Sequence, residues 1–94
     1  MPFILVRHTV EDFATWKPSY DEHATMRKDA GSKGSQVLRS ADNPQEVVVL
    51  LEWDNLQNAQ AFAGSLDLRA AMEKAGVIGQ PDILFLDEVE RSGA

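Results

Sequence analysis

The stretch DNPQEVVVLLEWDN, residues 42–55, joins a turn, a strand and the start of a helix. Its first four residues favour a turn, and residues 46–54 are rich in the β-branched and bulky side chains that favour strands. Asn55 can then cap a helix with its side-chain oxygen. Residues 35–41, just before the turn, alternate enough for an edge strand. The sequence therefore predicts a β-hairpin that leads directly into a helix.

A strand and a helix are also predicted ahead of this hairpin. Residues 3–10 are mostly β-branched or bulky, and Asp12 can cap the following helix with its carboxylate. Pro18 lacks an N–H and fits only near the start of a helix, so we expect a first turn over residues 13–17 and then a bend. The main helix then covers residues 18–29, because Gly31 ends it.

After the hairpin, residues 56–75 carry apolar side chains at helical spacing, interrupted at Gly64 and Ser65, and residues 82–89 form a last strand. The predicted order is βαββαβ. Short right-handed connections fold this order into a four-stranded antiparallel sheet, with strands in the spatial order 4-1-3-2 and both helices on one face. This is a ferredoxin-like α+β fold, and residues 1–94 are expected to form a single domain.

The composition narrows the partners and the compartment. Nine basic and 15 acidic residues give a net charge of −6, which repels polyphosphates and disfavours nucleic acid as a partner. The chain has no cysteine, which excludes disulfides and thiolate metal sites and fits the cytoplasm. Its apolar opening stops at Arg7 and is too short to span a membrane. We therefore expect a cytoplasmic protein without a membrane partner.

Three of the four predicted strands contain continuous apolar runs, namely FILV at 3–6, VVVLL at 47–51 and ILFL at 83–86. An antiparallel sheet with one wet face should alternate, so these runs indicate that both faces are shielded from water. The helices cover one face only, and no segment remains for the other. Because a large exposed apolar face is unfavourable in a soluble monomer, we expect a second copy of the chain to cover it in a homodimer.

Three segments resemble a known family: HTVEDFATWKPSYDEH (8–23), NPQEVVVLLEWDN (43–55) and SLDLRAAMEKAGVIGQPDILFLDE (65–88). They are similar to the dimeric α+β barrels, and within them to the small antibiotic biosynthesis monooxygenase-like proteins. The resemblance implies a homodimer with a pocket between helices and sheet. Members of this family include oxygenases of polyketide anthrones and quinols that use no metal or flavin, and also haem-degrading proteins.

The resemblance does not extend to haem degradation. Those enzymes rely on an asparagine, a tryptophan and a histidine in a set arrangement, whereas the asparagines here lie in turns or at a helix start. No pair of histidine and acidic residues has the close spacing of a zinc site. We therefore expect neither haem nor a metal, and no other cofactor.

Two histidines are the candidate bases. His8 ends the first strand beside the start of the first helix, where a neutral imidazole could accept a proton from a phenolic substrate. A histidine at a strand end can equally serve only to hydrogen-bond the backbone. His23 lies further along the first helix and is the second candidate.

The first helix also carries the candidate substrate contacts. At about 100° per residue, Trp16, Tyr20 and Arg27 share one stripe, with His23 at its margin. Aromatic side chains at this spacing either form core or line a ligand site. Arg27 on an apolar stripe needs a carboxylate, a bound anion or a water-filled cavity, unless its head reaches solvent.

The predicted topology suggests a partner for Arg27. The end of the first helix approaches the end of the third strand, where Glu52 could face the helices, pair with Arg27 and close one end of the cavity. The remaining candidates would line the other end: His8, Trp16, Tyr20 and His23. Trp53 lines the pocket if its side chain faces the helices, or fills the dimer interface if it faces the other side of the sheet. We favour the dimer interface.

Two functions remain open from the sequence. The first is a cofactor-independent monooxygenase or cyclase that acts on an aromatic, polyketide-like small molecule, with His8 or His23 as base. The second is a non-catalytic dimer that binds a small molecule or serves a stress role. Oxygen uptake with anthrones or hydroquinones separates them.

Overall fold

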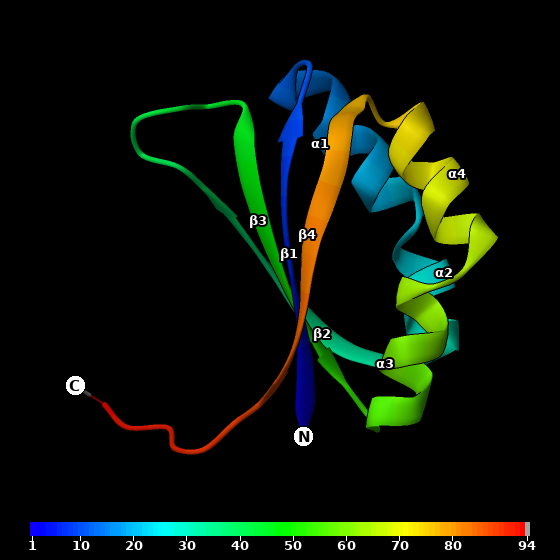
Figure 1. Ribbon diagram of the computed structural model, residues 1–94, viewed down its shortest axis with the longest axis vertical. Helices are drawn as coiled ribbons and strands as arrows, with labels where there is room; N and C mark the ends of the chain where they lie inside the picture. The colour runs from blue at the N-terminus through cyan, green and yellow to red at the C-terminus, as the bar shows by residue number, and fades with distance from the viewer. Residues whose placement is uncertain (94) are drawn as a thin grey trace.

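The structure, a computed structural model, describes residues 1–93. Its strands form one antiparallel sheet in the order β2-β3-β1-β4, as predicted, and Figure 1 shows the helices on one side of it. The strands are β1 (Pro2–Val10), β2 (Ser32–Arg39), β3 (Glu46–Trp53) and β4 (Val77–Asp87). The helices are α1 (Phe13–Glu22), α2 (Ala24–Ala30), α3 (Leu56–Ala63) and α4 (Leu66–Lys74). The ferredoxin-like α+β prediction is confirmed.

The helix ends follow local side-chain chemistry. Asn55 caps α3 as predicted, since its side-chain oxygen accepts the backbone N–H of Asn58 at 2.8 Å. Asp12 occupies the N-cap position of α1, but its carboxylate accepts from the Thr15 hydroxyl at 2.9 Å and not from a backbone N–H. None of the helices within residues 1–93 is long and apolar enough to cross a membrane.

The first helical region breaks at His23 and not at Pro18, so the predicted bend was misplaced. Pro18 lies inside α1, on the exposed side of the helix. Proline has no N–H to donate to the carbonyl of Ala14, one turn earlier, and Ala14 is exposed as well. The imidazole Nδ1 of His23 forms a hydrogen bond with the Ser19 carbonyl at 2.7 Å, and the backbone N–H of His23 donates to the Tyr20 carbonyl at 3.2 Å. This side-chain competition for a helical acceptor separates α1 from α2.

The last strand begins at Val77, earlier than the predicted start at Asp82. β4 is an edge strand, and its pairing with β1 shifts register between Arg7 and Thr9. Pro81 lies in this irregular part of the edge, where its missing N–H disturbs the sheet least. Pro81 therefore lies within β4, one residue before the predicted start of the strand.

The core lies between the helices and the sheet, and β3 shows how it is built. Alternate residues of β3 are fully buried toward the helices, and the others are half-buried on the opposite face. The buried set is Val47, Val49, Leu51 and Trp53. Trp53 is completely buried and packs on Phe62 of α3, with ring centroids 4.9 Å apart.

Apolar side chains also occupy the sheet face that no helix covers. Leu5 of β1 pairs with Leu50 of β3 on one side and with Leu84 of β4 on the other. Leu84 is 53% exposed and Leu86 is 39% exposed. The sheet therefore carries apolar side chains on both faces, and those of the helix-free face are partly exposed in the single chain.

Candidate active site

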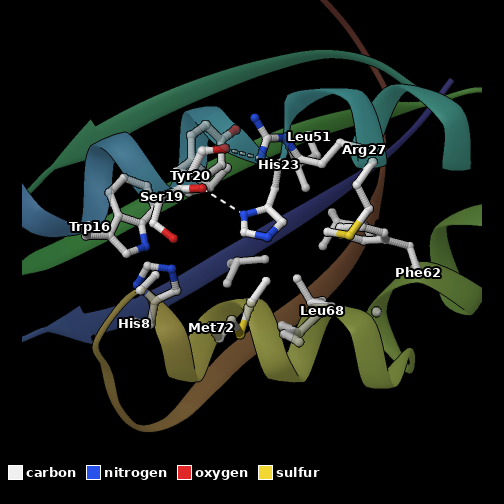
Figure 2. A pocket seen from close by; sticks show the side chains of 18 residues that line it. His8, Trp16, Ser19, Tyr20, His23, Arg27, Leu51, Phe62, Leu68 and Met72 are labelled. Carbon is white, nitrogen blue, oxygen red and sulfur yellow. Dashed lines mark hydrogen bonds between the residues drawn. The ribbon is translucent and has the colours of Figure 1, made fainter.

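A cavity of about 60 Å³ lies between the helices and the sheet. In Figure 2, α1 and α2 form one wall and α4 forms the wall opposite, with β1 behind. The lining is mostly apolar and includes no Asp or Glu. Five of the seven candidate residues line it: His8, Trp16, Tyr20, His23 and Arg27.

His23 projects into this cavity from the junction of α1 and α2. Its Nδ1 lies 2.7 Å from the Ser19 carbonyl oxygen, which can only accept a hydrogen bond. Nδ1 therefore donates in this contact, and in the neutral form of the ring the lone pair lies on Nε2. Figure 2 shows the imidazole in the middle of the cavity, with its second nitrogen turned away from Ser19. The backbone thus presents a defined proton acceptor in apolar surroundings.

His8 lies on β1, at the end of the cavity where Trp16 also lies. Only 6% of His8 is exposed, and its ring meets Trp16 edge-on with centroids 5.5 Å apart. Its Nδ1 is buried without a hydrogen-bond partner among the described residues. Burial lowers the pKa of His8 below its ordinary value of 6.5 and outweighs a smaller raising effect of its own backbone. His8 is therefore a neutral imidazole at neutral pH.

The lowered pKa of His8 predicts a pH-dependent loss of stability. Below pH 6.5 the unfolded chain binds a proton at His8 that the folded protein does not. The free energy of unfolding therefore falls as pH drops through this value, and the loss levels off below the folded pKa. Urea unfolding between about pH 7.5 and about pH 5.5 should show a steeper loss for wild type than for His8→Gln. Equal pH slopes in the two proteins would contradict the assignment, because their carboxylates are identical.

Arg27 and Tyr20 form a compact pair in the cavity wall. The Arg27 guanidinium lies over the Tyr20 ring, 3.6 Å from its centroid, and Nη1 donates to the Tyr20 carbonyl at 2.7 Å. Only 8% of Arg27 is exposed. Burial lowers the pKa of Arg27, and the nearby Tyr20 and Asp21 partly offset the effect.

The predicted division into two ends was wrong for Arg27. Helical side chains point back toward the helix N-terminus, and the break at His23 tilts the two helices, so Arg27 reaches back seven residues to Tyr20. Arg27 therefore shares one cavity with His23.

The predicted pairing of Arg27 with Glu52 was also wrong. Glu52 follows Leu51 and precedes Trp53, both buried toward the helices, so its own side chain points to the helix-free face. There Arg91 approaches its carboxylate at 3.9 Å. Trp53 faces inward under α3, not into the helix-free face where we favoured it, and it does not line the cavity.

Sequence reasoning missed Ser19, which lines the cavity and supplies the acceptor that orients His23. Its position three residues after Trp16 and four before His23 matched the helical spacing that identified them. Ser19 Oγ and Tyr20 Oη are buried without a hydrogen-bond partner among the described residues, as is His8 Nδ1. These three unsatisfied polar atoms belong to cavity residues, whereas a fourth, Trp53 Nε1, lies in the core outside the cavity. A polar ligand in the cavity could satisfy the three that line it.

The sequence and the fold both resemble those of known proteins. A family model for antibiotic biosynthesis monooxygenases matches residues 6–74. No curated protein matches the sequence. Solved structures with the same fold are numerous, and each of the three that follow is below 25% identical, so the likeness concerns the fold alone.

A Bordetella bronchiseptica protein provisionally named an antibiotic biosynthesis monooxygenase has a TM-score of 0.81 and 17% identity, covering 95% of this chain and 97% of its own. A Caulobacter crescentus protein with the same provisional name has a TM-score of 0.74 and 21% identity, covering 95% and 90%. SnoaB, a cofactor-independent oxygenase from Streptomyces nogalater, has a TM-score of 0.79 and 12% identity, covering 99% and 97%. With residues 6–74 matched and the fold in agreement, this chain belongs to the antibiotic biosynthesis monooxygenase family.

Proposed function

We propose that this protein is a cofactor-independent monooxygenase that oxidises a small hydroxylated aromatic compound in the cavity. Its family supports the reaction class, and one protein that shares its fold, SnoaB, is a cofactor-independent oxygenase. The observation that carries the proposal is the hydrogen bond from His23 Nδ1 to the Ser19 carbonyl, because it leaves Nε2 as a base inside an apolar cavity.

A base and an apolar enclosure are what such a reaction requires of the protein. Loss of a proton turns a phenol or an anthrone into an electron-rich anion that can give electrons to O₂. When a ring CH₂ becomes a carbonyl, one atom of O₂ ends in the carbonyl and the other leaves as water with the two hydrogens. The substrate supplies all the electrons, so the chain has only to bind it, orient it and remove its proton.

The aromatic wall suits a planar substrate. Trp16 and Tyr20 are stacked, with ring centroids 4.9 Å apart and planes inclined by 24°. Tyr20 and Trp16 lie on α1, about one turn and two turns before His23. A substrate ring packed against this wall would place its hydroxyl group near the imidazole.

Entry of an aromatic ring requires the lining to move. The cavity holds about 60 Å³, whereas an engineered cavity that binds benzene measures about 150 Å³. The wall formed by α4 is the one expected to yield, because α4 contributes no fully buried residue. Its Leu68 and Met72 are half-buried, and methionine adapts readily to new shapes.

Oxygen uptake tests the proposed reaction. The protein is mixed with dithranol, an anthrone, or with a hydroquinone in air-saturated buffer that contains a metal chelator, and an oxygen electrode records the rate. We expect uptake above the rates of buffer and of heat-denatured protein, with one O₂ consumed per carbonyl formed. Uptake equal to those controls for both compounds would favour the non-catalytic binding protein instead.

For assembly, we infer a homodimer in which the helix-free sheet faces of two chains pack together. No helix of residues 1–93 covers the apolar face around Leu5, Leu50 and Leu84 (Figure 1). Its burial would remove an area typical of obligate interfaces, on the order of 2,000 Å² in total. The cavity lies on the other side of the sheet, so assembly leaves its helical walls free.

A further inference from the structure

Arg27 is a buried cation that forms no ion pair with any of residues 1–93, and the nearby Asp21 offsets the effect of its burial only in part. It is 8% exposed. A guanidinium has five N–H donors. Within residues 1–93 the guanidinium donates to one oxygen, the Tyr20 carbonyl, which is a neutral acceptor. Burying a charge in this way is unfavourable unless an anion joins it.

A second arginine shows that stacking alone does not require burial. Arg39 lies over the Phe13 ring at 4.7 Å, yet it is exposed and does not line the cavity. Its head stays in water, as expected of an arginine with a purely structural stacking role. Arg27, by contrast, is held inside the cavity wall.

The position of Arg27 relates it directly to the candidate base. Its Nη1 and the backbone N–H of His23 both donate to the Tyr20 carbonyl, at 2.7 Å and 3.2 Å respectively. The guanidinium therefore lies beside His23, and Figure 2 shows both on the same wall of the cavity. A ligand anion bound by Arg27 would bring the adjoining part of that ligand to the imidazole.

We propose that the cavity selects aromatic acids: Arg27 binds a carboxylate of the ligand, while its hydroxyl-bearing ring lies against Trp16 and Tyr20 and reaches His23. This inference rests on the proposed function for the role of His23, and it names the substrate class of the same site. The carboxylate would supply the negative charge that the cavity lining lacks. The buried hydroxyls of Ser19 and Tyr20, which have no partner among the described residues, would meet further polar groups of the ligand.

Binding of a matched pair of probes tests this without turnover. Para-hydroxybenzoate and para-hydroxybenzamide have nearly the same shape, but only the first is an anion at neutral pH. Isothermal titration under nitrogen gives both affinities for wild type. We expect the acid to bind about 10- to 100-fold more tightly, the range for a hydrogen bond to a charged group. Equal affinities, or no binding of either probe, would overturn the proposal.

Three variants assign the preference to Arg27. Arg27→Gln should abolish the difference between the two probes, and Arg27→Lys should keep part of it because the charge remains. Arg39→Gln, the stacked arginine outside the cavity, should leave it unchanged. An unaltered preference in a folded Arg27→Gln protein would refute the assignment. The wild-type comparison stands even if that variant fails to fold.

The outcome is independent of the oxygenase test. Preference for the acid without oxygen uptake would leave the binding site established and the reaction wrong. Oxygen uptake from dithranol with no preference between the two probes would leave the reaction established and Arg27 a structural residue.

Discussion

Replacement of His23 by glutamine is expected to lower kcat for oxygen-consuming turnover about 10²- to 10⁴-fold, the usual contribution of a positioned base. The glutamine amide can still donate to the Ser19 carbonyl that His23 Nδ1 now occupies, so the junction of α1 and α2 should keep its shape. What is lost is the lone pair of Nε2. Stopped-flow or electrode measurements of O₂ consumption at saturating substrate give the ratio directly.

His8→Gln is the matched control for this result. His8 is also a cavity imidazole, but it lies at the edge of Trp16 and its buried Nδ1 has no partner. Its loss should affect kcat much less than the loss of His23. If His8→Gln were the inactive variant and His23→Gln retained full activity, the roles of the two histidines would be exchanged and the tautomer argument would fail.

The strand order and the two apolar sheet faces could be predicted because they depend on patterns that many residues share. Runs such as residues 47–51 signal a strand whose faces are both shielded, and no single substitution changes that signal. The face of the sheet to which each side chain of the strand points could not be predicted in this way. One residue decides whether Glu52 or Trp53 faces the helices, and an uninterrupted apolar run carries no mark of which residues point inward.

The helical part of the site was predictable for a similar reason. Helical spacing placed Trp16, Tyr20 and Arg27 on one face of the helix, and all three line the cavity. The break between the helices at His23 was not predictable, because it follows from a side chain that competes for the Ser19 carbonyl. That one contact moves Arg27 beside His23, so local hydrogen bonding decides how the site is assembled.

Leu84→Glu is expected to abolish the proposed dimer. Leu84 is 53% exposed on the helix-free face, so a carboxylate there is solvated in a single folded chain. In a sheet-to-sheet dimer both copies would bury it, at a cost of several kcal/mol per ion. Because about 1.4 kcal/mol changes an equilibrium constant tenfold, the dimer Kd should rise by a factor of about 10³ or more. Sedimentation equilibrium at low micromolar concentration measures the change.

Leu66→Glu is the control for this experiment. Leu66 is 77% exposed at the start of α4, in the helical layer, and a carboxylate there faces the positive end of the helix dipole. It adds the same charge without touching the helix-free face. Wild type and Leu66→Glu should therefore sediment as dimers whose thermal midpoint rises with protein concentration, because folding and assembly are coupled. A wild-type protein that sediments as a stable folded monomer would refute the dimer and leave the apolar sheet face without its proposed cover.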